Sequence, residues 1–291
     1  MTQMLHANEF FEIARERYNI KLRREAGLPY PWTKDKILRD WRFTHIHRED
    51  DKTTIWMREN VRGPLSEICR ANPTPETRLA VVKGTLIFRW FNRIETGQII
   101  KDLLLDKWDS KVARDRLKDI HPVTTGAYII RGEDGYDKMN GVVAAIDRAL
   151  PRLPKMVPKW GATLEEAWND LCTLDYIGGF MAHETVTDLN HTVILENASD
   201  DMTWSNLGPG AIRGLGRVVN GDPEFFANSK KGQKEMLVLA QELLAMAQLE
   251  EFWPKEWKPW KLHQVEMTLC EFCKYCNAQD GKRLKRSYKP S

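Results

Sequence analysis

The segment Leu174-Asp175-Tyr176-Ile177-Gly178-Gly179-Phe180-Met181-Ala182 decides the fold that we expect for this chain. An apolar anchor is followed by two adjacent glycines and then by a small residue, which is the spacing of a helix-hairpin-helix motif. A glycine bend between two helices leaves backbone N–H groups without partners at the start of the second helix, and such groups bind phosphate. We therefore predict that Gly178 and Gly179 contact a DNA backbone.

A carboxylate and a second glycine turn follow this hairpin. Asp201 comes 19 positions after Ala182, and Gly208-Pro209-Gly210-Ala211 comes shortly afterwards. The second turn would supply further backbone N–H groups near the same acid, so Gly208 and Gly210 are also predicted to contact DNA. In helix-hairpin-helix DNA glycosylases a catalytic Asp follows the hairpin at a similar distance. Glycine turns between helices are also common as purely structural features, and that alternative stays open.

Length and composition limit the class of protein. A chain of 291 residues can bury a large core, so we expect one helical domain over residues 1–291, with residues 1–160 and 161–291 as candidate lobes around a cleft. The hydrophobic share of 42% and the charged share of 29% are ordinary for a globular protein. A net charge of +3 excludes a uniformly basic DNA-coating protein, although a local basic surface remains compatible with it.

Neither a secretory signal nor a membrane span is visible. The first six residues lack a basic region followed by an apolar run, and the most apolar stretch, Leu79 to Phe91, is interrupted by Lys83 and Arg89. Five unevenly placed cysteines indicate a reducing compartment rather than a disulfide framework. We expect a cytoplasmic protein without membrane contact, located in the host cytoplasm if it is viral.

Hydrophobic periodicity predicts an all-α fold with little strand signal. The first helix, Ala7 to Ala26, has a basic face that makes Arg23 and Arg24 candidate DNA contacts. Thr33 is expected to cap a second helix, and Gly97 to end a helix that Pro75 opens. The other expected helices are 111–118, 141–150, 164–171 with a Thr163–Glu166 capping box, 231–252 and 262–275. Eleven tryptophans supply either buried bulk or surfaces for stacking on bases.

Several other chemistries have weaker sequence support. His47-Arg48-Glu49 with Cys270 and Cys273 resembles parts of a zinc deaminase signature, but Leu269 replaces the expected Pro. Cys270, Cys273 and Cys276 could bind zinc or an iron–sulfur cluster, although core packing explains them better. A phosphate-binding kinase loop is missing, and His183-Glu184 lacks the second His of a zinc protease. We therefore expect no metal and no cofactor.

A set of short motifs spread over the chain resembles one known family. The motifs are Phe11-x-x-Ala14-Arg15-Glu16, Leu22-Arg23-Arg24-Glu25-Ala26-Gly27, Pro31-Trp32-Thr33, Arg42-Phe43, Arg48-Glu49-Asp50-Asp51-x-x-Thr54-x-Trp56, Phe88-Arg89-Trp90-Phe91-Asn92, Thr125-Gly126-Ala127-Tyr128, Gly208-Pro209-Gly210-Ala211-x-Arg213-Gly214 and Glu266-x-x-Leu269-Cys270-Glu271-Phe272-x-Lys274-Tyr275. Together they resemble the alpha-glutamyl/putrescinyl thymine pyrophosphorylase family of bacteriophages, whose helical domain also occurs in 5-hydroxymethyluracil DNA kinases. Cys273 departs from the family pattern, which has an Asp there.

The resemblance implies a helix-hairpin-helix glycosylase-like fold and an amino acid:DNA transferase. A separate kinase would first phosphorylate or pyrophosphorylate 5-hydroxymethyluracil in double-stranded DNA. The family enzyme would then replace that phosphate with an amine from an amino acid or a polyamine. The implied partners are thus the phosphorylated DNA, the amine and a hydroxymethyluracil DNA kinase. Glycine, other amino acids and putrescine all remain open as the donor.

The implied reaction assigns roles to particular side chains. The target base should be flipped out of the duplex before the phosphate is displaced. Arg48 and Arg213 are candidates for binding the phosphate, since guanidinium matches phosphate in a two-pronged way. The candidates for deprotonating or orienting the amine are Asp201, Asp50, Asp51 and Glu266. Lys274 completes the predicted catalytic set. An ion pair with Lys274 is the structural alternative for Glu266, although a spacing of eight residues along a helix makes such a contact indirect.

Three further possibilities stay open at this point. Cys270 could add to the pyrimidine ring and help to expel the phosphate through an exocyclic methylene. The chain could instead be a DNA glycosylase that releases a free base. It could also be a non-catalytic DNA-binding module that partners a hydroxymethyluracil DNA kinase.

Overall fold

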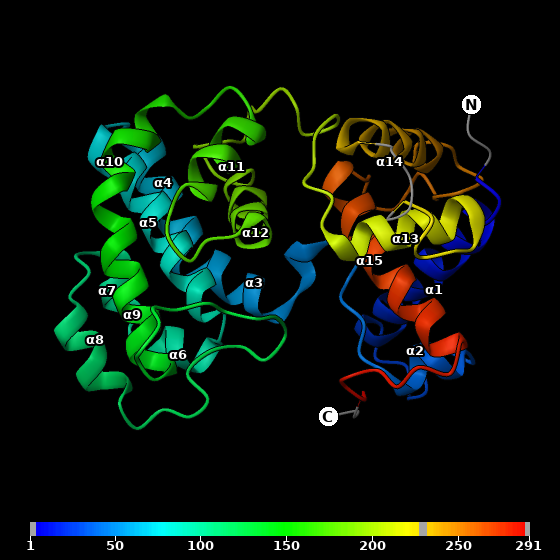
Figure 1. The fold of residues 1–291 in the computed structure, drawn as a ribbon, viewed down its shortest axis with the longest axis horizontal. Coiled ribbons are helices and arrows are strands. Elements are labelled where there is room, and N and C mark those ends of the chain that lie inside the picture. Colours follow the sequence, from blue (N-terminus) through cyan, green and yellow to red (C-terminus); the bar gives the residue numbers. More distant parts are fainter. Residues whose placement is uncertain (1–3, 227–231, 289–291) are drawn as a thin grey trace. The chain divides into compact units, whose positions relative to one another are not determined.

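The computed structural model describes residues 4–226 and 232–288, and it is all-helical, as predicted (Figure 1). Within those residues the β pairing is an isolated antiparallel bridge between Trp41 and Ser287. The chain forms two compact units: unit 1 consists of Met1–Asp51 and Met202–Ser291, and unit 2 of Lys52–Asp201. No helix in the described ranges has both the length and the apolar character needed to cross a bilayer.

Unit 2 is built around one long buried helix, α5. Its elements are α3 (Lys52–Met57), a π-helical turn η2 (Arg58–Arg62), α4 (Gly63–Ala71), α5 (Pro75–Phe91), α6 (Ile94–Ile99), α7 (Lys101–Leu105), α8 (Ser110–Leu117), α9 (Lys138–Ala149), η3 (Leu150–Arg152), α10 (Leu153–Met156), η4 (Val157–Lys159), α11 (Leu164–Cys172) and α12 (Gly179–Leu189). Thr74 caps α5 by accepting a hydrogen bond from Thr77 N, and Pro75 opens the helix as expected.

The end of α5 differs from the prediction. The helix stops at Phe91, where Asn92 takes a left-handed conformation with φ 44°, rather than at Gly97. Gly97 lies inside α6, where a Cβ atom would come within 2.8 Å of the rings of Trp56 and Phe88. Gly97 is therefore a packing position, because its missing side chain lets α6 approach these rings.

Two helices, α11 and α12, flank the glycine turn for which a helix-hairpin-helix was predicted, and they lie side by side in Figure 1. Thr163 caps α11 by accepting from Glu166 N at 3.2 Å, and the carboxylate of Asp200 accepts from Leu164 N and Glu165 N. The residue of the turn with a left-handed backbone conformation is Tyr176, with φ 64°, whereas Gly178 is extended. Gly178 precedes α12 without a side-chain cap.

Unit 1 joins the two ends of the chain around an aromatic core. Its elements are α1 (Ala7–Glu25), α2 (Lys36–Asp40), a 3-10 turn η1 (Arg48–Asp50), α13 (Pro209–Asn220), α14 (Gln233–Ala247) and α15 (Leu262–Gln279). Phe10 on α1 packs edge-on against Trp260 and Phe272, with ring centroids 6.2 and 5.6 Å apart. The first and last helices therefore share one core.

Three boundaries in unit 1 differ from those predicted. Asp35, not Thr33, caps the second helix, accepting from Leu38 N at 2.9 Å, while Thr33 Oγ1 accepts from Asp35 N. Helix α14 ends at Ala247 instead of residue 252, since the chain turns there to bring Trp253 against Trp260 at 5.0 Å. Helix α15 runs four residues beyond 275. Lys231, where α14 was predicted to begin, lies outside the described residues.

Helices α13 and α15 cross in close contact, as Figure 1 shows for the yellow and red ribbons of unit 1. A Cβ atom on Gly214 would overlap the carbonyl oxygen of Leu269, and one on Gly210 would lie 2.9 Å from Cys270 Sγ. Glycine is required at Gly214, because any side chain there would meet the backbone of Leu269 and push the helices apart. At Gly210 an added Cβ atom would first meet the Cys270 side chain.

Replacing Gly214 with Ala is expected to destabilise the protein by about 3 kcal/mol, because the added methyl group overpacks a backbone contact that cannot yield. An unconstrained helical glycine would instead gain about 0.5–1 kcal/mol from the same change. Urea denaturation followed by circular dichroism measures the difference. Gly232→Ala is the control: its methyl group meets nothing within 4 Å, and because Gly232 is the N-cap of α14 the change should cost no more than about 1 kcal/mol. Equal stability of the two variants would contradict this account of the α13–α15 contact.

Candidate functional site

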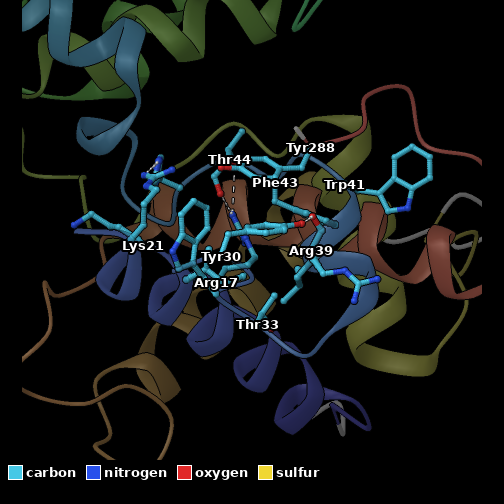
Figure 2. A pocket seen from close by; sticks show the side chains of 14 residues that line it. Arg17, Lys21, Tyr30, Thr33, Arg39, Trp41, Phe43, Thr44 and Tyr288 are labelled. Atoms are coloured by element: carbon cyan, nitrogen blue, oxygen red, sulfur yellow. Dashed lines mark hydrogen bonds between the residues drawn. The ribbon is translucent and has the colours of Figure 1, made fainter. Parts of the chain in front are cut away.

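A pocket in unit 1 lies beside α1, at the junction of the N-terminal segment and the end of the described chain (Figure 2). It holds about 580 Å³ of empty space, part of it open to solvent. Its lining consists of Arg17, Ile20, Lys21, Arg24, Tyr30, Trp32, Thr33, Leu38, Arg39, Trp41, Phe43, Thr44, His45 and Tyr288. Basic and aromatic side chains dominate this lining, and no carboxylate belongs to it among the described residues.

Arg17 is the buried cation of the pocket. Its side chain is 6% exposed, and Nη2 donates to the carbonyl oxygen of Thr44 at 2.7 Å. Nε and Nη1 have no hydrogen-bond partner within the described part of the chain. Burial lowers the pKa of Arg17, opposed by the charges of Glu271 and Asp51. A guanidinium nevertheless stays charged at neutral pH. Figure 2 shows Arg17, Tyr30 and Thr44 at the centre of the pocket and Trp41 toward one side.

Three aromatic rings make up one wall. The ring centroid of Tyr30 lies 5.4 Å from that of Trp32, edge-on, and 6.2 Å from that of Tyr288, nearly parallel. Trp32 and Tyr288 are 6.1 Å apart. Tyr30 is 39% exposed, so its ring presents surface to an incoming molecule. Such rings offer stacking surfaces for a planar ligand.

Helix α15 anchors the segment that forms this pocket. Tyr275 donates its hydroxyl to Asp35 Oδ2 at 2.6 Å, Thr44 N donates to Glu271 Oε2 at 3.2 Å, and Lys274 Nζ donates to the carbonyl oxygen of Arg42. These contacts attach both ends of residues 35–44 to one rigid helix. The pocket lining therefore depends on the position of α15.

Residues 286–288, at the end of the described chain, pair with residues 40–42 of the segment that lines the pocket. Arg42 N donates to the carbonyl oxygen of Arg286 at 3.1 Å, and Tyr288 N donates to that of Asp40 at 2.8 Å. Figure 1 shows this red C-terminal segment running beside α2. Residues 286–288 thereby bring Tyr288 to the pocket.

Asp50, one of the predicted catalytic acids, is held by two lysines. Its carboxylate lies 3.1 Å from Lys21 Nζ and 2.8 Å from Lys258 Nζ. Burial raises its pKa, but the hydrogen bonds to Lys258 and Lys21 outweigh burial, so the pKa of Asp50 is lowered. Asp50 is therefore an ionised anchor for Lys21 at the pocket rather than a strong base.

Asp51 and Arg24 meet at His45 on the pocket lining. Asp51 Oδ1 accepts from His45 N at 3.4 Å, and Arg24 Nη2 lies 3.1 Å from His45 Nε2. Burial, followed by the charge of Arg24, lowers the pKa of His45 to about 4. Burial likewise lowers the pKa of His47 to about 4, against the charge of Asp50. Both imidazoles are neutral at pH 7.

Glu266, a residue of α15, lies beside the N-terminal end of α13. It is 7% exposed, its Oε1 is 3.8 Å from the position that a Gly208 Cβ would take, and Cys270 Sγ donates to it at 3.6 Å. The structure thus brings Glu266, Gly208, Gly210 and Cys270 together. Burial and the Glu266 charge raise the pKa of Cys270 well above its usual value, so this residue is a thiol and a poor nucleophile.

The other predicted residues are distributed over both units. Lys274 contacts Glu271 at 3.2 Å and lies over the Phe43 ring, not beside Glu266. Arg23 pairs with Glu16 at 2.8 Å, and exposed Arg213 lies 3.6 Å from Glu224. Arg48 is buried in η1, whereas Gly178, Gly179 and Asp201 belong to unit 2. Within the described ranges no cluster of three or more His, Cys, Asp or Glu side chains could hold a metal ion.

Sequence reasoning did not single out the pocket itself. The basic face of the first helix pointed to Arg23 and Arg24 rather than to Arg17, and Pro31-Trp32-Thr33 entered only as one of the family motifs. A proline-flanked pair of aromatic residues directly after a basic helix was the available signal. Tyr288 had no such signal, because it reaches the pocket only through tertiary pairing with residues 40–42.

These features define an all-helical protein with a pocket that is both cationic and aromatic. The chain belongs to the family described as the helical domain of 5-hmdU DNA kinase, whose model matches residues 5–283. It is 26% identical to the 5-hmdU DNA kinase of Bacillus phage SP10, over 90% of this chain and 43% of that protein. The chain therefore spans less than half the length of this relative. No solved structure matches it.

The stability of the protein should fall as the pH is lowered from 6.5 to 4. His45 and His47 have pKa values of about 4 when folded and about 6.5 when unfolded, so the unfolded chain binds more protons in this window. Asp50, with its lowered pKa, adds to this loss only near and below 3.8. Denaturation across this pH range should show a shallower slope for His47→Gln than for the wild type. The exposed His121→Gln is the control, and equal slopes would contradict the assignment.

Proposed function

We propose that the chain is a transferase of bacteriophage DNA hypermodification. In this proposal it replaces the phosphate or pyrophosphate of phosphorylated 5-hydroxymethyluracil in DNA with an amine from an amino acid or a polyamine. Membership of a family named for the helical domain of a 5-hmdU DNA kinase supports the connection to this base. The observation that carries the proposal is the pocket, because its buried cation and aromatic wall match a phosphorylated pyrimidine.

The reaction requires a flipped base, since the exocyclic carbon of a stacked base is inaccessible. The carbon–oxygen bond to the phosphate breaks, a bond from the amine nitrogen to that carbon forms, and the amine loses a proton to a base. The phosphate leaves with its electron pair, which cationic side chains stabilise. Water must be excluded so that hydrolysis does not compete.

We propose the following distribution of roles over the predicted residues. Within unit 1, Arg48 and Arg213 stabilise the leaving phosphate and Glu266 accepts the proton of the amine. Asp201, which belongs to unit 2, is the alternative acceptor of that proton. Asp50 and Asp51 position Lys21 and His45, which agrees with the contacts that they make. Lys274 holds the pocket segment through the Arg42 carbonyl.

DNA binding is proposed for the two glycine turns and for the basic face of α1. Gly178, the N-cap of α12, supplies no side-chain cap, which supports a phosphate contact at Gly178 and Gly179, in keeping with a helix-hairpin-helix glycosylase-like fold. Gly208, also without a side-chain cap, offers a similar start for α13. Gly210 has a packing role as well, because it contacts Cys270. Arg23 and Arg24 would approach the backbone from α1.

A non-catalytic module that presents DNA to a kinase is the second candidate. The observation in its favour is that the chain covers only 43% of a relative named as a kinase. Both candidates couple the chain to a hydroxymethyluracil DNA kinase. In both, the protein would act in the host cytoplasm.

The deciding assay supplies double-stranded DNA with phosphorylated 5-hydroxymethyluracil together with glycine, glutamate or putrescine. Digestion to nucleosides and mass spectrometry should show a new amine-bearing nucleoside with one of the donors. Abasic sites would instead indicate a glycosylase, and unchanged DNA that is nevertheless bound would indicate the non-catalytic module. Either result would contradict the transferase.

Asp201→Ala and Arg48→Ala should each lower turnover by about 100-fold or more, as expected when a proton acceptor or a transition-state cation is removed. Lys234→Gln, an exposed charge on α14, is the control and should retain the wild-type rate. Because Arg48 is buried, Arg48→Lys and circular dichroism separate lost chemistry from lost folding. Near-normal turnover in Asp201→Ala would show that the acid lies elsewhere.

A further inference from the structure

The two ends of the chain meet in an antiparallel pairing that places two arginines opposite each other. Trp41 and Ser287 form the bridge, and Arg42 N donates to the carbonyl oxygen of Arg286 at 3.1 Å beside it. In this register Arg42 stands directly opposite Arg286, and the α-carbons of such a hydrogen-bonded pair lie about 5.5 Å apart. Like charges in directly opposed positions destabilise an antiparallel pairing.

The acids beside this pairing do not neutralise the two arginines. Both arginines are exposed, and neither forms an ion pair within residues 4–226 and 232–288. Asp40 pairs with its neighbour Arg39 at 2.7 Å, and Glu271 pairs with Lys274 at 3.2 Å. The meeting of the chain ends thus holds two like charges together, and an anion that contacts both would remove their repulsion.

Three more cations extend this pair along the segment that leads to it. They are exposed, and they form no ion pair with any residue that the structure describes. Asp280, the nearest acid in the sequence, pairs with Arg217 instead. The chain as a whole carries a net charge of +3, so without these five cations its formal charge would be negative. We call the five cations the basic surface: Arg42, Lys282, Arg283, Lys285 and Arg286.

The length of the basic surface fits the backbone of a nucleic acid better than a small anion. An extended chain covers at most about 3.6 Å per residue, so residues 282–286 span up to roughly 18 Å. Each strand of duplex DNA presents a phosphate about every 3.4 Å of helix axis, so a segment of this length passes several phosphates. A single small anion would contact only one or two of the five cations.

We propose that the basic surface binds the phosphate backbone of duplex DNA, with one phosphate held between Arg42 and Arg286. Binding here is independent of base sequence and of base modification, because the cations contact phosphates and not bases. The proposal deepens the proposed function and rests on it for the choice of DNA. The basic surface is separate from the glycine turns and from α1, and it requires residues 40–42 and 286–288 to pair.

Fluorescence anisotropy with a short labelled duplex measures binding to the full chain over a range of NaCl concentrations. The double variant Arg42→Gln/Arg286→Gln should weaken binding about tenfold or more at low salt. It should also reduce the steepness with which log Ka falls against log [NaCl] by about 2, since each phosphate contact contributes about 1. The control Lys111→Gln/Lys234→Gln, which removes two exposed charges elsewhere, should keep the wild-type steepness. An unchanged salt dependence in the first variant, or the same change in both, would overturn the proposal.

Two further ligands separate backbone binding from its alternatives. With a duplex that contains phosphorylated 5-hydroxymethyluracil, Arg42→Gln/Arg286→Gln should lose affinity by the same factor as with unmodified DNA. A loss confined to the phosphorylated duplex would assign these arginines to the modified base and overturn the proposal. Vesicles that contain phosphatidylserine offer another polyanionic surface. Binding of the vesicles by the wild type without binding of the duplex would also overturn it.

A thermal melt followed by circular dichroism separates lost contacts from lost folding. Arg286→Gln should unfold at the same temperature as the wild type or at a higher one, because it removes the repulsion from Arg42. A lower melting temperature would contradict the opposed pair. DNA binding that depends on the basic surface, without any DNA modification, would refute the proposed function alone. DNA modification with unaltered DNA affinity in Arg42→Gln/Arg286→Gln would refute the basic surface alone.

Discussion

The close crossing of α13 and α15 is the contact on which the pocket in unit 1 depends. Gly210 and Gly214 allow α13 to pack closely against α15. This contact helps to fix the position of α15 in unit 1. The outer part of α15 then supplies Glu271, Lys274 and Tyr275, which attach residues 35–44 through hydrogen bonds. A helix–helix contact made at glycine positions of α13 thus determines where the lining of the pocket lies.

The electrostatics of the pocket follow from the same arrangement. The nearby carboxylates lie outside the pocket lining, on α15 and in the segment that contains Asp50 and Asp51. The lining itself consists mainly of cationic and aromatic side chains. Lys21 is paired with Asp50 and Glu25, and Arg39 with Asp40, so acids outside the lining neutralise these two cations. His45 and His47 stay neutral because burial opposes their protonation, so they add no charge to the pocket at pH 7.

Local patterns predicted much of the fold. Apolar periodicity located α1, α5, α11 and α15, and capping chemistry located the start of α11 at Thr163. The predicted ends of α5 and α14 were wrong because tertiary contacts determine what these residues do. Gly97 packs on Trp56, and α14 ends where the chain brings Trp253 against Trp260. Gly210 was predicted as a DNA contact, and its contact with Cys270 became visible only once two helices far apart in sequence were brought together. The pocket was missed for the same reason, since Arg17 and Tyr288 come from opposite ends of the chain.

Photo-crosslinking tests the central claim most directly, namely that the pocket of unit 1 receives the target pyrimidine. Double-stranded DNA carrying 5-iododeoxyuridine at one target position would be irradiated with the full chain, and the attached peptide identified by mass spectrometry. Adducts should map to Tyr30, Trp32 or Tyr288, and their yield should drop in Arg17→Met but not in Lys234→Gln. Adducts confined to other parts of the chain, with the same yield in both variants, would contradict the account.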